Sequence, residues 1–301
     1  MAGLQQPMAA GLSRHRRGLL LVAGGVVLWS IGGLLARLVD ADPWTILFWR
    51  SLFACVFLFG YVAIQSKGRI IETFAQLGWP GVIVGVCFAI GSTCFINAIA
   101  YTTIANVLFM QALAPFLAGL LAWLLMRERI AGRTIVAMLA ALLGIGIMVY
   151  HSIAAGHGVG DLLAIMMATA LAGAIVTMRR HHDIRMAPAA CLATGLAAIW
   201  SFLPATPGSV PGGDYIFLVL FGVVQMGIGL ILFTGGTRLI PAAESALLTV
   251  LESVLAPLWV WLVLAEDPGL ATIIGGGIAL AALVLNTIID WRGTREVAPG
   301  V

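Results

Sequence analysis

The stretch Trp123-Leu-Leu-Met-Arg-Glu128 recurs in closely similar form as Trp261-Leu-Val-Leu-Ala-Glu266, 138 residues further along the chain. At the same offset the longer segment Ala100–Ile147 aligns without a gap with Arg238–Leu285. Self-similarity at a fixed offset is the sequence signature of a repeated structural unit. The sequence therefore predicts a chain built from two related halves.

The composition excludes a soluble protein. Of the 301 residues, 61% are hydrophobic and only 10% are charged, and the mean hydropathy is +1.06. Soluble domains carry about 25% charged residues. These values exclude a cytosolic enzyme, a disordered chain and a secreted disulfide scaffold, and they predict an integral membrane protein that resides in a lipid bilayer. The net charge of +3 is small and gives no indication of a nucleic-acid partner.

The chain contains enough apolar sequence for ten membrane-spanning helices, because one span needs about 20 apolar residues. Breaker residues or charges bound each run. The ten runs are Gly18–Val39, Pro43–Ile64, Trp79–Ala100, Thr103–Met126, Thr134–Tyr150, Leu162–Met178, Ala187–Leu203, Tyr215–Gly236, Pro241–Ala265 and Pro268–Ile289. The expected fold class is an all-α membrane protein with ten transmembrane helices.

The repeat offset equals five of these runs. An odd number of spans places the two copies in opposite orientations in the membrane, so we expect two inverted five-helix repeats. The expected domains are a tail at 1–17, a first repeat at 18–150, a second repeat at 160–289 and a tail at 290–301. Inverted repeats are typical of secondary transporters, which bind substrate near the bilayer midplane between the halves.

Basic residues predict the orientation. If the N-terminus is cytoplasmic and the runs alternate, all of the 16 Lys and Arg residues except Arg37 and Arg50 fall on the cytoplasmic side. This asymmetry follows the positive-inside rule. We therefore expect a multi-pass protein of the bacterial inner membrane whose N- and C-termini are both cytoplasmic.

Several motifs resemble a known family. The segments Tyr101-Thr-Thr-Ile-Ala-Asn106, Leu113-Ala-Pro115 and Trp123-Leu-Leu-Met-Arg-Glu128 resemble the EamA module of the drug/metabolite transporter superfamily, and Glu252-Ser-Val254 and Trp261-Leu-Val-Leu-Ala-Glu266 resemble its second copy. The opening Leu28-Trp29-Ser30 with Arg37, the segment Phe48-Trp49-Arg50-Ser51 and the segment Gly160-Asp161-Leu162-Leu163 are similar to the family pattern as well. The resemblance covers nearly the whole chain. One departure is Ser253, which stands where the family commonly has proline.

The opening motif is similar to that of the YddG-type amino-acid exporters. This resemblance implies export of aromatic or other neutral amino acids by alternating access, as a monomer or homodimer. Export of nucleotides or purines, or of cationic drugs, is the alternative within the superfamily. The sequence contains no P-loop, HExxH or GxSxG motif, so we expect no enzyme activity, no catalytic residues, no metal and no cofactor.

Polar residues at membrane depth are the candidates for substrate contact. Glu252 lies near the middle of the ninth run, where a carboxylate is costly and usually faces a cavity or a partner. A protonated acid bonded to a neighbouring helix is the structural alternative for Glu252, and the helix dipole explains Glu244 equally well. The expected substrate-binding residues are Trp29, Ser30, Thr93, Asn97, Tyr101, Gln111, Gln225, Glu244, Thr249 and Glu252.

Three further residues have expected roles of a different kind. Pro115 and Pro257 are interior prolines that should kink their helices and serve in gating. Arg50 could bind a substrate carboxylate, but the sequence favours a structural role in which it snorkels outward or pairs with Asp40 or Asp42.

Overall fold

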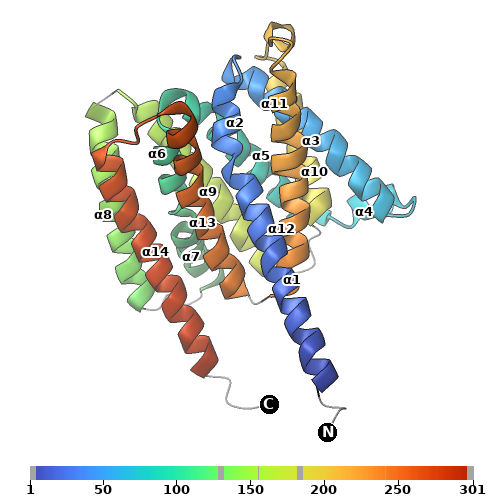
Figure 1. The fold of residues 1–301 in the computed structure, drawn as a ribbon, viewed down its shortest axis with the longest axis vertical. Helices are drawn as coiled ribbons and strands as arrows, with labels where there is room; N and C mark the ends of the chain where they lie inside the picture. The colour runs from blue at the N-terminus through green and yellow to red at the C-terminus, as the bar shows by residue number, and fades with distance from the viewer. Residues whose placement is uncertain (1–4, 128–131, 155, 182–185, 241, 297–301) are drawn as a thin grey trace.

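The computed structural model describes residues 5–127, 132–154, 156–181, 186–240 and 242–296, and its regular elements in these ranges are all helical (Figure 1). They are α1 (Gln5–Ser30), α2 (Gly32–Leu38), α3 (Pro43–Gln65), α4 (Ile70–Ala75), α5 (Gly78–Tyr101), α6 (Ile104–Gln111), α7 (Ala114–Met126), α8 (Gly132–Ala154), α9 (Gly158–Arg180), α10 (Met186–Phe202), η1 (Pro207–Ser209), α11 (Tyr215–Val219), η2 (Leu220–Ile228), α12 (Gly229–Thr237), α13 (Ala242–Leu264) and α14 (Leu270–Glu296).

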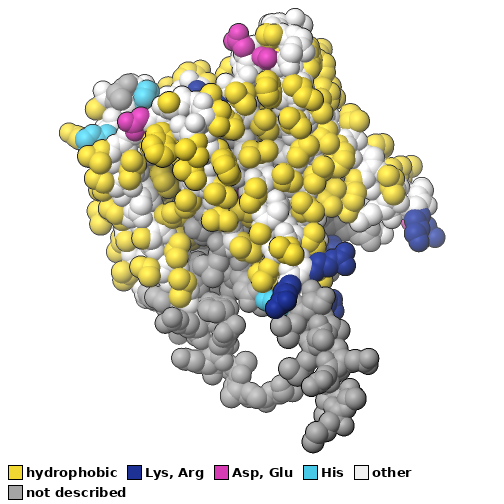
Figure 2. All heavy atoms as spheres, viewed as in Figure 1, with side chains coloured by type: hydrophobic (Ala, Val, Ile, Leu, Met, Phe, Trp, Pro, Cys, Tyr) yellow, Lys and Arg dark blue, Asp and Glu magenta, His cyan; other side chains and the backbone are white. Residues whose placement is uncertain are grey.

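Ten apolar helical segments make up the bundle. Within the described ranges, seven are long and apolar enough to cross a membrane, and three shorter apolar helices cover 186–202, 251–264 and 270–286. The space-filling view in Figure 2 shows hydrophobic side chains over most of the visible flank of this bundle. The predicted all-α fold with ten transmembrane helices is confirmed.

The first residues of α1 and the last residues of α14 lie at the same end of the bundle (Figure 1). We call this the terminal end and the opposite end the distal end. An even number of crossings returns the chain to the side on which it began, and ten crossings satisfy this condition.

The helix contacts have a two-fold pattern that matches the repeat. α1 packs on α12 and α13, and its counterpart five spans later, α9, packs on α5 and on the pair α6 and α7. α3 packs on η2 as α10 packs on α5. The equivalent helices α3 and α10, α6 and α13, and α8 and α14 pack directly on each other. Each large contact thus has a counterpart in the other repeat or joins two equivalent helices.

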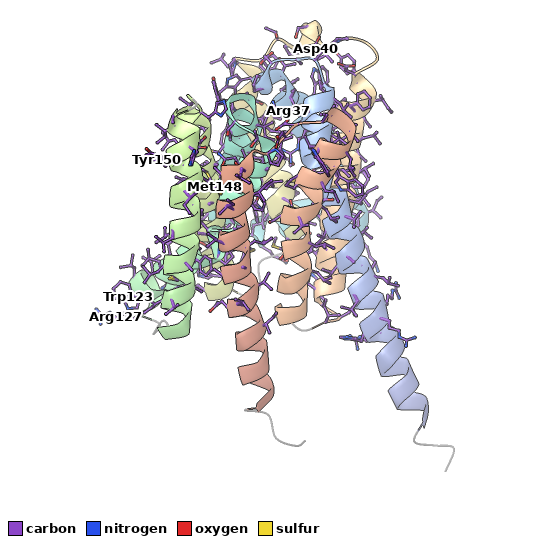
Figure 3. All side chains as sticks on the ribbon, turned by 60° about the vertical axis from the view of Figure 1, so that its left-hand side comes forward. Arg37, Asp40, Trp123, Arg127, Met148 and Tyr150 are labelled. Atoms are coloured by element: carbon purple, nitrogen blue, oxygen red, sulfur yellow. The ribbon has the colours of Figure 1, made fainter. Side chains whose placement is uncertain are left out.

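The backbone repeats the same relation at the ends of α7 and α13. Arg127 and Ala265, which correspond at the 138-residue offset, both adopt the left-handed conformation, with φ of 54° and 52°. Figure 3 shows Arg127 at the terminal end, whereas Glu266 contacts Arg37 at the distal end. Equivalent positions therefore lie at opposite ends, as two inverted repeats require.

Two of the ten segments are interrupted within the described residues. The first breaks at Ile31 between α1 and α2, and the fourth breaks at Ala112 and Leu113 between α6 and α7. Pro115 was expected inside one kinked helix. It stands instead at the start of α7, where its fixed φ suits the first turn and its missing N–H costs no hydrogen bond. Pro257 does lie inside a helix, α13.

Glycines let α1 and α12 approach each other closely. A Cβ on Gly25 would lie 2.8 Å from the carbonyl oxygen of Gly229 and 2.9 Å from the backbone nitrogen of Phe233. Two helical turns further along, a Cβ on Gly236 would lie 2.8 Å from the Gly18 carbonyl oxygen. The contacts recur at seven-residue spacing on both helices, so a continuous glycine seam joins the first and eighth spans.

We predict that Gly25→Ala lowers the stability of the protein by about 1–3 kcal/mol, because the added methyl must displace backbone atoms. Gly24→Ala is the matched control, since a Cβ there meets only Leu232 Cδ1 at 3.6 Å. The pair Gly236→Ala and Gly235→Ala repeats the comparison on α12, where a Cβ on Gly235 meets nothing within 4 Å. Thermal unfolding of the purified protein in detergent measures the difference. Equal midpoints within each pair would contradict the seam.

Candidate functional site

Polar side chains gather where the first span breaks. Ser30, the last residue of α1, is fully buried and its hydroxyl accepts a 3.0 Å hydrogen bond from Trp259 Nε1 of α13. The preceding carbonyl, that of Trp29, accepts a 3.3 Å hydrogen bond from Gln225 Nε2. Helix ends have carbonyl groups that lack intrahelical partners, and side chains from the eighth and ninth spans approach the break at Ile31.

The eighth span presents Gln225 from an unusual helix. Residues 220–228 form η2, a π-helical segment, and such segments are frequent at functional sites. Gln225 is buried, and its Oε1 atom has no hydrogen-bond partner among the described residues. The indole nitrogen of Trp29 is also buried without a partner. Buried polar groups are nearly always hydrogen-bonded, so these two atoms lack the partners that such groups ordinarily have.

Arg50 lies beside this cluster. It is only 5% exposed, donates a 2.8 Å hydrogen bond from Nη1 to Ser92 Oγ, and places its guanidinium carbon 4.4 Å from the centre of the Phe221 ring. Nη2 lies 3.7 Å from Met226 Sδ, and Nε has no partner. Among the described residues no carboxylate pairs with Arg50. A buried cation is expensive unless it is paired.

The structural role expected for Arg50 is therefore wrong in both its forms. The side chain is buried and does not snorkel outward. Asp42 instead caps α3, accepting hydrogen bonds from the backbone nitrogens of Trp44 and Thr45 and from Thr206 Oγ1. Partial burial acts in the opposite direction, but these hydrogen bonds lower the pKa of Asp42. Asp40 is exposed at the distal end (Figure 3).

We use the name polar belt for this set of side chains, which come from five spans. Counted along their helices at 1.5 Å per residue, they lie about 7–15 Å from the distal helix ends, so the belt lies in the distal half of a hydrocarbon core about 30 Å thick. Its members are Trp29, Ser30, Arg50, Ser92, Phe221, Gln225 and Trp259.

The candidates on α5 are brought together only in part. Thr93 Oγ1 accepts a 3.0 Å hydrogen bond from Trp200 Nε1, and the Thr93 carbonyl accepts one of 2.9 Å from Asn97 Nδ2. The side-chain amide of Asn97 is thus already hydrogen-bonded within α5. Tyr101, at the distal end of α5, is 53% exposed and lines neither of the cavities described below.

The remaining candidates are Glu244, Thr249 and Glu252 on α13 and Gln111 on α6. Glu252 and Thr249 are half-buried, and the Glu252 carboxylate has no hydrogen-bond partner among the described residues. The side chain of Glu244 lies outside the described part of the chain. Gln111 is half-buried at the last position of α6, directly before the break in the fourth span.

The sequence also contained signals for residues that were not predicted. Ser245, Glu252 and Trp259 are spaced by seven residues, so Trp259 shares a helix face with Glu252. That spacing could have identified Trp259. Nothing comparable identifies Ser92 or Phe221, because their contacts with Arg50 depend on the packing of α3 against α5 and η2.

Two cavities open at opposite ends of the bundle. One of about 450 Å³ lies at the terminal end between α3, α10 and α12, and its polar lining includes Tyr61, Gln65 and Thr234. The other, of about 490 Å³, lies at the distal end between α6, α8 and α14 and is lined by Asn106 and Ser152 among others. The polar belt lies between the two ends.

An ion pair joins the two halves at the distal end. Arg37 Nε of α2 donates to Glu266 Oε2 at 3.1 Å, and Glu266 Oε1 accepts a 3.1 Å hydrogen bond from the backbone nitrogen of Ile104. Arg37 Nη2 also donates to the Thr102 carbonyl at 3.0 Å. We call this arrangement the distal latch, because it ties α2 and α6 of the first half to the α13–α14 connection of the second.

Comparisons with known proteins agree with this architecture. The model of the EamA-like transporter family matches residues 16–150 and again residues 158–288. No curated protein matches the chain. One solved structure, titled only "Crystal structure of protein", is 21% identical with a TM-score of 0.63, and the alignment covers 90% of this chain and 97% of that one. At this identity the likeness shows the fold. Because the two family matches span most of the sequence, the chain belongs to the EamA-like transporter family.

Proposed function

We propose that the protein is a secondary transporter that exports amino acids, aromatic or other neutral ones, across the bacterial inner membrane by alternating access. The observation that carries this proposal is the buried, unpaired guanidinium of Arg50. An arginine buried within the membrane without a carboxylate partner is suited to bind the carboxylate of a substrate, because the guanidinium matches carboxylate geometry with two parallel hydrogen bonds.

Other parts of the site fit the remaining groups of an amino acid. The unpaired Gln225 Oε1 is an acceptor for a substrate ammonium, and the half-buried carboxylate of Glu252 adds negative charge on the ninth span. The indole of Trp259 contacts Ser30 and the indole of Trp29 packs on Phe233, and both supply apolar surface. The other candidates from the sequence, Thr93, Asn97, Tyr101, Gln111, Glu244 and Thr249, remain proposed contacts or wall residues.

Export of cationic drugs is the second candidate. Glu252 favours it, since a carboxylate in the membrane attracts a cation. A cationic drug without an acidic group, however, would leave Arg50 unpaired and would be repelled by it. Nucleotides or purines would use the tryptophans for stacking, and nucleotide phosphates would bring two or more negative charges to a single arginine.

A growth-rescue screen tests the substrate class. Cells that overproduce the protein are challenged with toxic amino-acid analogues, toxic nucleobase analogues and cationic dyes, and an empty vector is the control. The proposal predicts rescue from amino-acid analogues. Rescue confined to the dyes or to the nucleobases would contradict it.

Alternating access would use the interrupted spans. The breaks at Ile31 and at Ala112–Leu113 and the prolines Pro115 and Pro257 are positions where helices bend at low cost. We propose that the two repeats, 18–150 and 160–289, rock against each other at these positions and expose the polar belt first to one side and then to the other. The protein would act as a monomer or homodimer.

The charge distribution supports cytoplasmic termini. Figure 2 shows most visible Lys and Arg side chains toward the terminal end and Asp and Glu side chains at the distal end. Under the positive-inside rule the terminal end faces the cytoplasm. A reporter fused after Val301 should then be active in the cytoplasm, and periplasmic activity would contradict the proposed orientation.

For Glu252→Gln we predict that transport of a neutral amino acid falls and loses part of its pH dependence, because the variant keeps the size of the side chain and removes its titration. Uptake of tritiated phenylalanine into inverted membrane vesicles between pH 6 and pH 8 measures this effect, and Glu72→Gln, an exposed residue of α4, is the control. An unchanged rate and an unchanged pH profile would show that Glu252 is a packing residue.

A further inference from the structure

A second buried polar cluster lies at the distal end, apart from the polar belt. Asp161, in the first turn of α9, and Asn106, in the first turn of α6, are each 2% exposed, and Asn106 Nδ2 donates to Asp161 Oδ1 at 2.5 Å. Asn106 Nδ2 also lies 3.1 Å from Thr102 Oγ1 and 3.4 Å from Ser152 Oγ. The cluster thus connects the distal ends of four spans.

Two buried acceptors of this cluster are unsatisfied among the described residues, although the cluster also contains the hydroxyl groups of Thr102 and Ser152. Asn106 Oδ1 and Asp161 Oδ2 are both buried and both lack a hydrogen-bond donor. They belong to two side chains that are already hydrogen-bonded to each other, so no rearrangement of the existing amide protons serves both atoms. One added proton on the Asp161 carboxyl group turns an orphan acceptor into a donor. Buried polar groups without partners are destabilising.

His157 interacts electrostatically with Asp161, but no cation forms an ion pair with it among the described residues. The ionisable groups near it are His157 at the start of its own helix, His151 of α8, and the two members of the distal latch, Arg37 and Glu266. Arg37 is paired with Glu266. A buried carboxyl group without a cation favours its neutral form.

The proton has a route to this site. Asn106, Ser152 and both histidines line the distal cavity of about 490 Å³, the wall of which also includes Met148, labelled in Figure 3. A cavity of this size admits water. The cavity lies between α6 and α8 of the first repeat and the start of α14 in the second, so a change in the cluster acts on the contact between the repeats.

We propose that Asp161 and Asn106 form a proton-binding site, at which one proton from the distal cavity converts the Asp161 carboxylate to a carboxylic acid that donates a hydrogen bond within the cluster. Proton occupancy stabilises the arrangement in which α6, α8 and α9 are joined at the distal end. A ligand that binds one arrangement better than another shifts the population toward it. Low pH on the distal side therefore favours this closed arrangement, and loss of the proton favours its separation.

Infrared difference spectroscopy tests this inference without a transported substrate. The full-length protein is reconstituted in lipid and titrated, and the C=O stretching band of protonated carboxylic acids is followed. We expect one component of this band at neutral pH to be removed by Asp161→Asn and to be kept in the exposed control Asp40→Asn, whereas Glu252→Gln removes only the separate contribution of Glu252. Since the experiment needs no substrate, its outcome is independent of the proposed amino-acid export.

Ser152→Ala is a second variant that keeps the test valid if Asp161→Asn does not fold. It keeps the carboxyl group and removes one hydroxyl from the cluster, so the Asp161 band should persist at a shifted frequency. If Asp161→Asn leaves the protonated-carboxyl band unchanged, or if Ser152→Ala does not shift it, Asp161 is not the proton site. The cluster would then be a structural contact at the start of α9.

Discussion

Arg50→Met should abolish transport of phenylalanine while leaving the protein folded. Truncating one partner of a buried, hydrogen-bonded charge pair costs about 2–5 kcal/mol, which corresponds to a loss of apparent affinity of about 30-fold or more. Without substrate, Arg50 is a buried cation with no carboxylate partner among the described residues, so replacing it with an apolar side chain of similar length should leave the thermal midpoint equal or raise it.

Measuring both transport and stability distinguishes a substrate-binding role of Arg50 from a structural role. Transport is measured as uptake of tritiated phenylalanine into inverted vesicles, and stability as thermal unfolding of the purified protein. Arg69→Met, at an exposed position, is the matched control. Phenethylamine, which lacks the carboxylate, should compete equally poorly in the wild type and in Arg50→Met. A variant that transports normally, or one that loses stability and transport together, would contradict a substrate-binding role for Arg50.

Glu266→Ala should open the distal end of the bundle. The carboxylate accepts hydrogen bonds from Arg37 and from the backbone nitrogen of Ile104, and its side chain is only 21% exposed. Hydrogen bonds to charged groups contribute about 1.5–3 kcal/mol each, so their loss should raise the population of the open form by about 10-fold or more. Maleimide labelling of Ile104→Cys, a fully buried position beside the latch, reports the opening in a background without the four native cysteines.

Asp267→Ala provides the control for the latch. It removes a neighbouring carboxylate that, among the described residues, accepts a hydrogen bond only from the backbone nitrogen of Gly269, in its own turn. The labelling rate should stay at the wild-type value in this variant and rise in Glu266→Ala. Equal rates in the two variants would show that the ion pair does not hold the distal end closed.

Much of the fold could be predicted from the sequence because length and hydropathy determine how often a chain crosses a bilayer. The ten runs and the 138-residue offset were sufficient for the ten helices and their inverted arrangement. The interruptions were harder to predict. The break at Ile31 has no proline, and η2 lies where glycines allow close contact of η2 with α3 and of α12 with α1. Such features come from packing between spans, which hydropathy does not describe.

The site was less predictable for a related reason. Trp29, Ser30 and Gln225 were recognised as polar or aromatic residues at depth, and the structure brings them together. Arg50 was misread because its nearest acids in the sequence, Asp40 and Asp42, suggested ion pairing, whereas the fold commits Asp42 to capping α3. Tyr101 followed the right helical spacing but extends to the exposed end of α5. Spacing identifies a helix face and does not identify the neighbour that covers it.

Counterflow in proteoliposomes tests the central claim most directly, namely that the protein is a carrier that alternates access to one amino-acid site. Liposomes containing the purified protein are loaded with unlabelled phenylalanine and diluted into a trace of tritiated phenylalanine. The account predicts that the label accumulates transiently above its external concentration, and that Arg50→Met abolishes the accumulation. Label that merely equilibrates, at a rate independent of the internal amino acid, would contradict a carrier mechanism.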